Sequence, residues 1–396
     1  MMQEIETDIV VVGAGLVGLS AAIAFAQQGK KVVLVDAKIP VIKLKKAWDE
    51  RVYALTPATE SWLKGIGVWA HVDVSRVNTI KAMHIFDDAN VLDKSQAQPL
   101  VLRDEDANLP KLGLIIENQN LMAALWQQLK LLDVTVITDM PCQSLENTQQ
   151  HAVLGLVNGQ QVRAKLIIAA DGVESWVRKQ TGIGVTKKDF HQTAIVANFL
   201  AEKQHQNIAR QWFAPHDVLA LLPLPDKMVS IVWSVSTEKA VKLLALSAEE
   251  LAHNVHAHSE SVLGELTQVG NTQAFALHQQ TALQLIAERV VIMGDAAHQI
   301  HPMAGQGVNL GFRDVMQLAS MVTKLHAMQD AGDATFLRQY ERARKADITT
   351  MNQFTVGLDA LYANESSILK NARQWGLQQL NQQAAIKKLL IQQVAA

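Results

Sequence analysis

The chain has 396 residues, of which 49% are hydrophobic and 19% are charged, so it is long enough for two domains and too apolar to be disordered. Its 36 basic and 38 acidic residues give a formal net charge of −2 at pH 7, which argues against nucleic-acid binding through overall charge. The single cysteine, Cys142, excludes an intrachain disulfide and a thiolate metal cluster and is typical of a reducing cytosol.

The first apolar stretch, residues 9–26, is almost long enough to suggest a membrane span. Acidic residues precede it where a signal peptide would carry positive charge, and three glycines interrupt it (Glu4, Glu6 and Asp8; Gly13, Gly15 and Gly18). A buried strand, a glycine turn and a helix explain the stretch better. We therefore expect no targeting segment and a cytoplasmic protein.

A β-α-β unit is predicted from this stretch onward. Ile9–Val12 and Lys31–Val35 are apolar runs typical of buried parallel strands, and residues 16–28 between them form a small-residue helix. The turn before the helix reads Gly13-Ala14-Gly15-Leu16-Val17-Gly18. Glycines at this spacing permit a tight turn, let a pyrophosphate approach the backbone at the helix N-terminus, and let helix and strand pack closely. The pattern predicts a dinucleotide site, and the alternative is a glycine turn that binds nothing.

Asp36 closes the second strand. Its carboxylate is suited to accept hydrogen bonds from the ribose hydroxyls of an adenosine. It would repel a 2′-phosphate, which disfavours NADP at this position.

Two further apolar strands are predicted at 165–170 and 289–293. The first leads into Asp171-Gly172 and the second into Gly294-Asp295. Because open α/β sheets bind ligands at the carboxyl ends of their strands, we expect all these ends to face one cofactor. Asp171 bridges cofactor and a second ligand in one interpretation, with Arg178 orienting it or reaching phosphate. In the other interpretation Asp171 only caps the following helix.

The segment from Gly294 to Asn309 is a second cofactor-shaped loop, almost three hundred residues after the first. Asp295 is placed to accept hydrogen bonds from ribitol or ribose hydroxyls, and the N–H groups of the run Gly305-Gln306-Gly307-Val308-Asn309 would point at a ring that gains negative charge on reduction. Pro302 is a rigid residue that would pack beside that ring. One long cofactor held at both ends explains both loops, and the natural candidate is FAD. His298 and His301 make a poor zinc site, so no metal is expected.

The middle of the chain is predicted to be an inserted, largely antiparallel β domain. Residues 218–224 and 228–234 form a β-hairpin around a Pro-Asp turn. We assign 1–75, 101–180 and 281–335 to a discontinuous Rossmann-like α/β domain, 76–100 and 181–280 to the inserted domain, and 336–396 to a helical region. From Ser366 on there are four basic and no acidic residues (Lys370, Arg373, Lys387 and Lys388). Such an end either packs on its own domain or contacts an anionic membrane surface or a partner.

With these elements in order, the chain resembles the FAD-dependent aromatic-ring monooxygenases, and most closely the ubiquinone-biosynthesis hydroxylases. The most specific piece is GDAAHQIHPMAGQGVNLGFRD, from Gly294 to Asp314. Supporting pieces are GAGLVG at Gly13, ADGVESWVR at Ala170 and the hairpin ALLPLPDKMVSIVWS at Ala220. The resemblance also implies that Arg51, in an Arg-x-x-Ala-Leu segment, lies near the flavin, and that Gln119 holds cofactor where the family often has arginine.

The resemblance implies a hydroxylase that uses FAD, with NAD(P)H as a transient co-substrate. NAD(P)H reduces the flavin, which captures O2 as a peroxide and transfers one oxygen to an electron-rich phenol ring. No covalent catalyst is expected, and Pro302, Gly305 and Gly307 lie beside the reacting oxygen. The hairpin forms the substrate wall, through Leu222, Pro223 and Trp233. The expected substrate is a polyprenylated phenol or quinol of ubiquinone biosynthesis, which would bring the enzyme to the inner face of a membrane.

Several alternatives stay open. A small soluble aromatic acid would need a convergent arginine, and residues 181–280 of the inserted domain have only Arg210. An isoprenoid reductase on the same fold is a further possibility, whereas an amine oxidase fits the Gly294–Asn309 segment poorly. The chain is alternatively a non-catalytic FAD-binding member of a biosynthetic assembly, which would not oxidise NAD(P)H.

Overall fold

The computed structural model describes residues 4–40, 44–87, 99–300, 306–326, 329–363 and 366–395. One large sheet has the order β17-β18-β11-β1-β2-β8, with β10 and β9 added beside β11. The four strands predicted from apolar runs all belong to it and pair in parallel: β1 (Glu4–Val12), β2 (Val32–Val35), β11 (Gln161–Ala169) and β18 (Val290–Ile292). The remaining strands are β8 (Val134–Ile137), β9 (Cys142–Asn147), β10 (Ala152–Leu156) and β17 (Ile286–Ala287).

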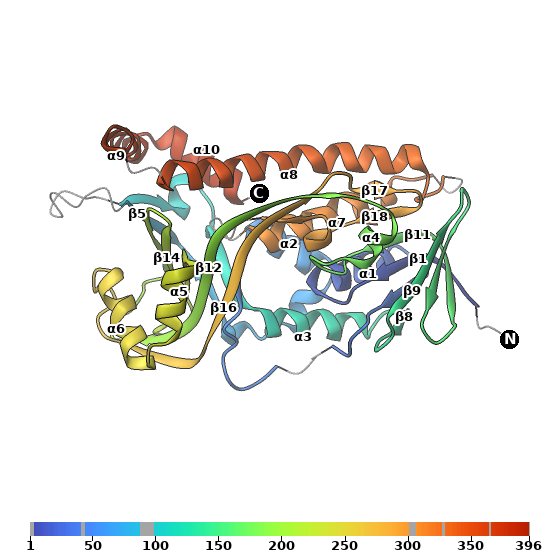
Figure 1. Ribbon diagram of the computed structural model, residues 1–396, viewed down its shortest axis with the longest axis horizontal. Coiled ribbons are helices and arrows are strands. Elements are labelled where there is room, and N and C mark those ends of the chain that lie inside the picture. The colour runs from blue at the N-terminus through green and yellow to red at the C-terminus, as the bar shows by residue number, and fades with distance from the viewer. Residues whose placement is uncertain are drawn as a thin grey trace.

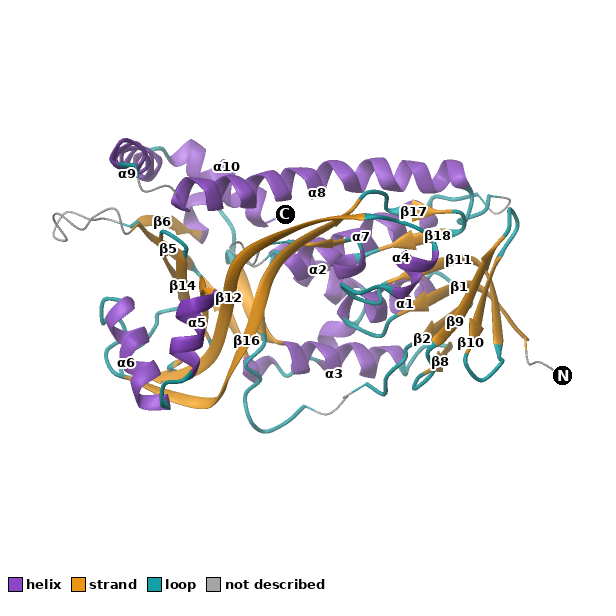
Figure 2. Ribbon diagram, in the orientation of Figure 1, coloured by secondary structure: helices purple, strands orange, loops and turns teal. Residues whose placement is uncertain are grey.

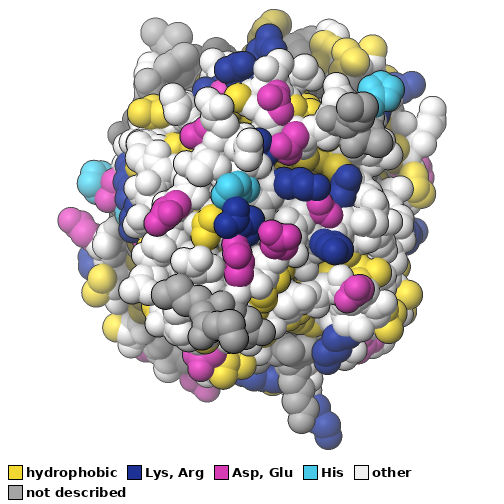
Figure 3. Space-filling view, turned by 90° about the vertical axis from the view of Figure 1, so that its right-hand side faces the viewer, with side chains coloured by type: hydrophobic (Ala, Val, Ile, Leu, Met, Phe, Trp, Pro, Cys, Tyr) yellow, Lys and Arg dark blue, Asp and Glu magenta, His cyan; other side chains and the backbone are white. Residues whose placement is uncertain are grey.

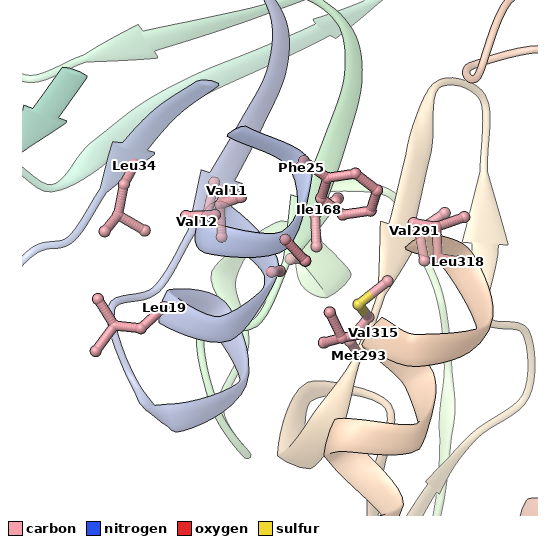
Figure 4. Close-up of a cluster of buried hydrophobic side chains, with 14 of the residues drawn as sticks. Val11, Val12, Leu19, Phe25, Leu34, Ile168, Val291, Met293, Val315 and Leu318 are labelled. Carbon is pink, nitrogen blue, oxygen red and sulfur yellow. The ribbon is translucent and has the colours of Figure 1, made fainter. Parts of the chain in front are cut away.

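Helix α1 (Leu16–Gln27) connects β1 to β2 and lies in the middle of the core (Figure 1). Nine of its twelve residues are buried, because α3 (Asn118–Leu129) and α7 (Gly307–Thr323) contact it as well as the sheet. Figure 4 shows the resulting cluster, to which the sheet, α1 and α7 all contribute (Val11, Ile168 and Val291; Leu19 and Phe25; Val315 and Leu318). Burying side chains of this size stabilises the fold by about 1.5–3 kcal/mol each. The start of α1 is therefore held rigidly against the sheet.

The second large sheet has the order β19-β16-β12-β15-β14-β13-β5-β6 and is antiparallel except where β13 pairs with β5. Figure 2 shows its two longest strands curving side by side from the first sheet to the far half of the molecule. The predicted hairpin is present as β14 and β15. The strands are β5 (Ala82–Asp87), β6 (Leu100–Arg103), β12 (Val185–Ala201), β13 (Ile208–Ala214), β14 (Asp217–Pro223), β15 (Met228–Ser236), β16 (Leu266–Ala282) and β19 (His298–Gln299). The α/β class with a largely antiparallel second sheet is confirmed, and the exact domain boundaries stay a prediction.

A small third sheet lies between the two large ones and consists of β3 (Val52–Leu55), β7 (Gly113–Glu117) and β4 (Val77–Ile80). Arg76 donates to both oxygens of the fully buried Glu117, each at 2.6 Å. Glu117 also accepts the backbone N–H of Asp49 at 2.6 Å. This buried ion pair fixes the segment that leads into β3. The shorter helices are α2 (Pro57–Gly65), α4 (Trp176–Gln180) and, packed on the second large sheet, α5 (Thr237–Leu244) and α6 (Ala248–His258).

Three helices end the chain, as predicted: α8 (Ala334–Ala363), α9 (Ser367–Gln382) and α10 (Ala384–Ala395). Two of the four basic residues of this end are paired within the protein, because Arg373 binds Asp87 and Lys387 binds Asp106. Trp375 and Leu389, in contrast, are each 66% exposed. Within the described ranges, no helix is long and apolar enough to cross a membrane. The C-terminal end thus packs on its own protein while leaving apolar side chains outside.

Candidate active site

A cavity of about 810 Å³ lies between the carboxyl ends of the parallel strands and one face of the second sheet. Its described lining brings together residues from four distant stretches of the chain. They include Gly15 and Val17 before and within α1, Arg51 and Tyr53 at β3, Gly294 and Asp295 after β18, and Gln306 and Val308 at the start of α7.

The first glycine turn has the geometry that a pyrophosphate site requires. Gly13 has φ +102°, and a Cβ there would lie 2.4 Å from the carbonyl oxygen of Ala170. A Cβ at Gly18 would lie 1.8 Å from the Gly13 carbonyl oxygen, so only glycine lets α1 approach the strand. A Cβ at Gly15 would meet nothing within 4 Å, and Gly15 lines the cavity. The α1 N-terminus therefore opens onto free space, where its N–H groups suit phosphate.

Asp36 braces this turn. Its Oδ2 accepts the Ala14 N–H at 2.6 Å and its Oδ1 accepts the Lys38 N–H at 2.8 Å. Each carboxylate oxygen keeps a further lone pair for a ribose hydroxyl. Asp36, like Gly13, Ala14 and Gly18, supports the turn rather than lining the described cavity.

The N-terminus of α7 faces the same cavity, through Gln306, Gly307 and Val308. Asn309 fastens this helix to β3, because its Oδ1 accepts the Thr56 N–H at 3.1 Å and its Nδ2 donates to the Ala54 carbonyl at 2.8 Å. Pro302 and Gly305 lie outside the described residues. Two helix N-termini, those of α1 and α7, thus point into one cavity, and both favour negative charge.

Asp295 and Arg51 bring opposite charges to the cavity. The Asp295 side chain is open to the cavity, but protein encloses it, and this loss of water raises its pKa. Arg51 and His298 act against that rise. The Arg51 guanidinium lies 5.4 Å from the centre of the Tyr53 ring, and burial raises the pKa of Tyr53 to about 12. An enclosed carboxylate that has no hydrogen-bond partner among the described residues, and that lies beside open space, suits a ligand that offers hydroxyl donors.

Asp171 and Gln119 do not line the described cavity. Asp171 accepts Ser175 Oγ at 2.5 Å and the Val177 N–H at 3.1 Å, which is the helix-capping arrangement. Its neighbours Gly172 and Val173 are lining residues. The Gln119 N–H donates to Asp49 Oδ2 at 3.0 Å, and its side-chain oxygen is buried without a partner among the described atoms.

Arg178 connects two loops beside the cavity and does not line the described cavity. It donates to the Ala296 carbonyl at 2.7 Å and to the Val173 carbonyl at 2.8 Å. It therefore ties the loop after β11 to the turn after β18, and neither oxygen of Asp171 accepts a hydrogen bond from it in the described contacts.

The second sheet forms the cavity wall opposite these loops. The side chains of β14 and β15 that face the cavity alternate along each strand. From β14 the wall takes Val218, Ala220 and Leu222, and from β15 it takes Val232 and Ser234. Trp233 points to the other face, where it is fully buried and its Nε1 donates to Asp217 Oδ1 at 2.6 Å. Pro223 is also buried and absent from the described lining. Because successive side chains of a strand face opposite ways, Trp233 and Pro223 leave the predicted wall while Leu222 stays in it.

Sequence reasoning missed several lining residues on the second sheet. Strand alternation from Leu222 would have found Ser234, and pairing of β13 with β14 would then have found Gln211, which lies opposite Ala220. No signal in the sequence marks Phe275 or His278 on β16. Arg51 is the only arginine or lysine among the described lining residues, since Arg210 points away and donates to the His205 carbonyl at 3.2 Å.

Within the described part of the chain, no group of three or more His, Cys, Asp or Glu side chains is arranged to hold a metal ion. On the face shown in Figure 3, acidic and basic side chains are interspersed rather than gathered by sign.

The sequence profile of the family "FAD binding domain" matches residues 6–355. Ubiquinone hydroxylase UbiL of Rhodospirillum rubrum is 32% identical over 97% of this chain and 88% of that protein. The 3-demethoxyubiquinol 3-hydroxylase of Escherichia coli is 33% identical over 93% of this chain and 92% of its own. Among solved structures, p-nitrophenol 4-monooxygenase PnpA of Pseudomonas putida superposes with a TM-score of 0.78 at 17% identity, over 100% of this chain and 99% of that one. The chain therefore belongs to the FAD binding domain family, as an FAD-dependent monooxygenase of the ubiquinone-hydroxylase group.

Proposed function

We propose that this enzyme hydroxylates the ring of a polyprenylated phenol or quinol in ubiquinone biosynthesis, using NAD(P)H and O2. The observation that carries the proposal is the character of the wall opposite the cofactor loops. Its described residues are small and apolar over most of the sheet face (Ala194, Val196, Ala209, Val218, Ala220, Leu222 and Val232). Such a surface accepts a neutral ring with an apolar tail. The two ubiquinone hydroxylases named above agree with this substrate class.

The residues present fit FAD. The open space at Gly15 suits the pyrophosphate, Asp36 the adenosine ribose, and Asp295 the hydroxyls of the ribityl chain. When bound, FAD supplies electron transfer from NAD(P)H and activation of O2. The N-terminus of α7, at Gly307, would favour negative charge on the ring, while Pro302 and Gly305 keep their proposed place beside it. The apolar wall would keep water away from the reacting oxygen.

A small aromatic acid is a weaker candidate substrate. Its carboxylate would lose hydration in the cavity and would need a paired cation at the substrate end. Arg210, the arginine of the stretch 181–280, points away from the cavity, and burial lowers its pKa. Arg51 stands at the cofactor end beside Tyr53. The charges of the described lining therefore favour a neutral phenol.

Anaerobic reduction tests the proposal. Purified protein is mixed with NADH or NADPH, with and without a short-chain prenylated phenol, and the flavin absorbance is followed. We expect faster bleaching with the phenol and, after admission of ¹⁸O2, one labelled oxygen in the ring product. Equal or faster turnover of 4-hydroxybenzoate would favour the acid substrate. Bound flavin that neither nicotinamide reduces would favour the non-catalytic alternative.

We also propose that the C-terminal helices contact a membrane surface peripherally. Trp375 and Leu389 are exposed apolar side chains, and the chain after Ser366 has no acidic residue. Sedimentation with anionic vesicles should fall in the double variant Trp375→Ser, Leu389→Ser. The matched control is Val241→Ser on α5, which is 65% exposed in the inserted domain and should sediment like the parent protein. Equal sedimentation of all three proteins would contradict the contact.

A further inference from the structure

The buried carboxylate of Asp314 binds both ends of the turn from Gly294 to His298. Asp314 on α7 accepts the Gly294 N–H at 2.9 Å and His298 Nε2 at 2.6 Å, both through Oδ2. Its Oδ1 accepts Nε of Arg344, on α8, at 2.6 Å. The side chains of Asp314 and His298 are each 1% exposed, and that of Arg344 is 6% exposed. Three segments of the chain therefore meet on one carboxylate away from water.

The carboxylates of this cluster are matched by guanidinium groups. Arg344 also binds Asp347 at 2.6 Å, and Arg313 binds the other oxygen of Asp347 at 3.1 Å. Two carboxylates thus face two guanidinium groups. His298 Nε2 contacts Asp314 Oδ2, and the His298 Nδ1 is buried without a partner among the described atoms. Because an unpaired buried charge is costly, each member depends on the others.

Asp295 lies between the two residues that Asp314 clamps, and its side chain opens to the cavity. We propose that Asp314 is a positioning residue that aims Asp295 at the hydroxyl groups of the flavin side chain, with Arg344 as its counter-charge. Helix α8 then takes part in retaining the cofactor, although none of the described lining residues belongs to it. The inference rests on the FAD binding of the family and is independent of the aromatic substrate.

Titration of FAD into flavin-free protein tests the proposal. Asp314→Asn and Arg344→Met should raise the FAD dissociation constant roughly 10- to 100-fold, the range seen where an outer partner orients a ligating side chain. Arg344→Lys keeps the charge and should restore much of the affinity. The matched control is Arg373→Met, which breaks the equally buried pair with Asp87, 2% exposed on both sides, between α9 and β5. That variant should lower the melting temperature yet change FAD affinity by less than about twofold.

A double-mutant cycle with Asp295→Ala separates positioning from general stability. If Asp314 acts through Asp295, then Asp314→Asn should cost little further affinity once residue 295 is alanine. Additive losses would overturn the proposal, as would an equal loss of affinity in Arg373→Met and Arg344→Met. If Asp314→Asn does not fold, FAD affinity is compared between Arg344→Met and Arg344→Lys. Unchanged FAD affinity in both variants would overturn the proposal. No aromatic substrate is present in these titrations, so their failure is distinct from failure of the proposed reaction.

Discussion

The two ends of the cavity are built by different means. At the cofactor end the backbone forms the site, through a glycine with φ +102°, an open position at Gly15 and the N-termini of α1 and α7. At the substrate end side chains from neighbouring strands form the wall, and their identity depends on which face of each strand they occupy. Backbone sites need particular residues at fixed spacing, whereas a wall needs only size and polarity at scattered positions. The first kind of site therefore leaves a motif in the sequence and the second does not.

The largest effect is expected where the backbone leaves no room. The added Cβ of Gly18→Ala would lie 1.8 Å from the Gly13 carbonyl oxygen, and backbone on both sides cannot easily move. We expect a loss of about 3 kcal/mol or more in the free energy of unfolding and protein purified without flavin. Urea denaturation and the absorbance spectrum measure the two effects.

Gly15→Ala is the control for this change. Its Cβ would meet nothing within 4 Å, so the flavin-free protein should keep its stability while FAD binding weakens, because the methyl group fills space that faces the ligand. Equal losses of stability in Gly15→Ala and Gly18→Ala would contradict the view that Gly18 is needed for packing and Gly15 for ligand binding.

At the substrate end the expected effects are graded. Ala220→Phe places a ring in the middle of the apolar wall. We expect kcat/KM for the prenylated phenol to fall by about 10- to 100-fold, equivalent to about 1.4–2.7 kcal/mol, with FAD affinity unchanged. Steady-state kinetics and an FAD titration measure both. A parallel loss of FAD would mean that the two ends are not separable.

The same contrast explains what could be predicted from the sequence. The parallel strands, the hairpin and the C-terminal helices follow from apolar runs and turn residues, because their patterns are local. The sequence predicts both Leu222 and Trp233 in the substrate wall, and of the two only Leu222 lines the described cavity. The sequence cannot separate them, because a large aromatic residue suits a buried core and a ligand wall equally well. Only the register between β14 and β15, set by contacts distant in sequence, decides which face it takes. Phe275 and His278 both line the cavity although they are an odd number of residues apart on β16, and the register of β16 with β12 shifts beside His278, which no local pattern reveals.

Trp233→Phe sharpens the distinction between the two faces of β15. The variant keeps an aromatic ring in the core but removes the Nε1 donor that Asp217 accepts at 2.6 Å. We expect a loss of about 1–3 kcal/mol in the free energy of unfolding, since a buried acceptor loses its partner, with kcat/KM nearly unchanged. Val232→Ala, one residue earlier on the cavity face, should show the opposite balance, with altered KM and a smaller loss of stability. A large change in KM for Trp233→Phe would place its side chain in the substrate site after all.

The smallest expected effect is on the pH dependence of stability. It distinguishes a carboxylate that serves a ligand, such as Asp295, from one that stabilises the fold. Enclosure raises the pKa of Asp295 above its ordinary 3.8, so the folded flavin-free protein holds a proton that the unfolded chain releases. Its contribution to stability therefore falls as pH rises from below 3.8 through the folded pKa. Asp295→Asn should make the flavin-free protein more stable at neutral pH, by less than about 1 kcal/mol because water in the cavity screens the charge, and equal to the parent below pH 3.8. The same variant should bind FAD more weakly.

The stability contribution of Asp217, the first residue of β14, should depend on pH with the opposite sign. Asp217 is half-buried, which alone would raise its pKa, but His258, Lys239 and Trp233 hold the pKa below its usual value. Its ionised form therefore stabilises the fold above the ordinary pKa, and this contribution is lost as pH falls through the lowered one. Asp217→Asn should reduce stability at neutral pH, with a difference that shrinks on acidification. Thermal melts of both variants from about pH 2 to pH 8 measure the two slopes, because the Asp217 contribution changes below the ordinary pKa of 3.8. Slopes of the same sign would mean that Asp295 serves the fold as Asp217 does, rather than a ligand.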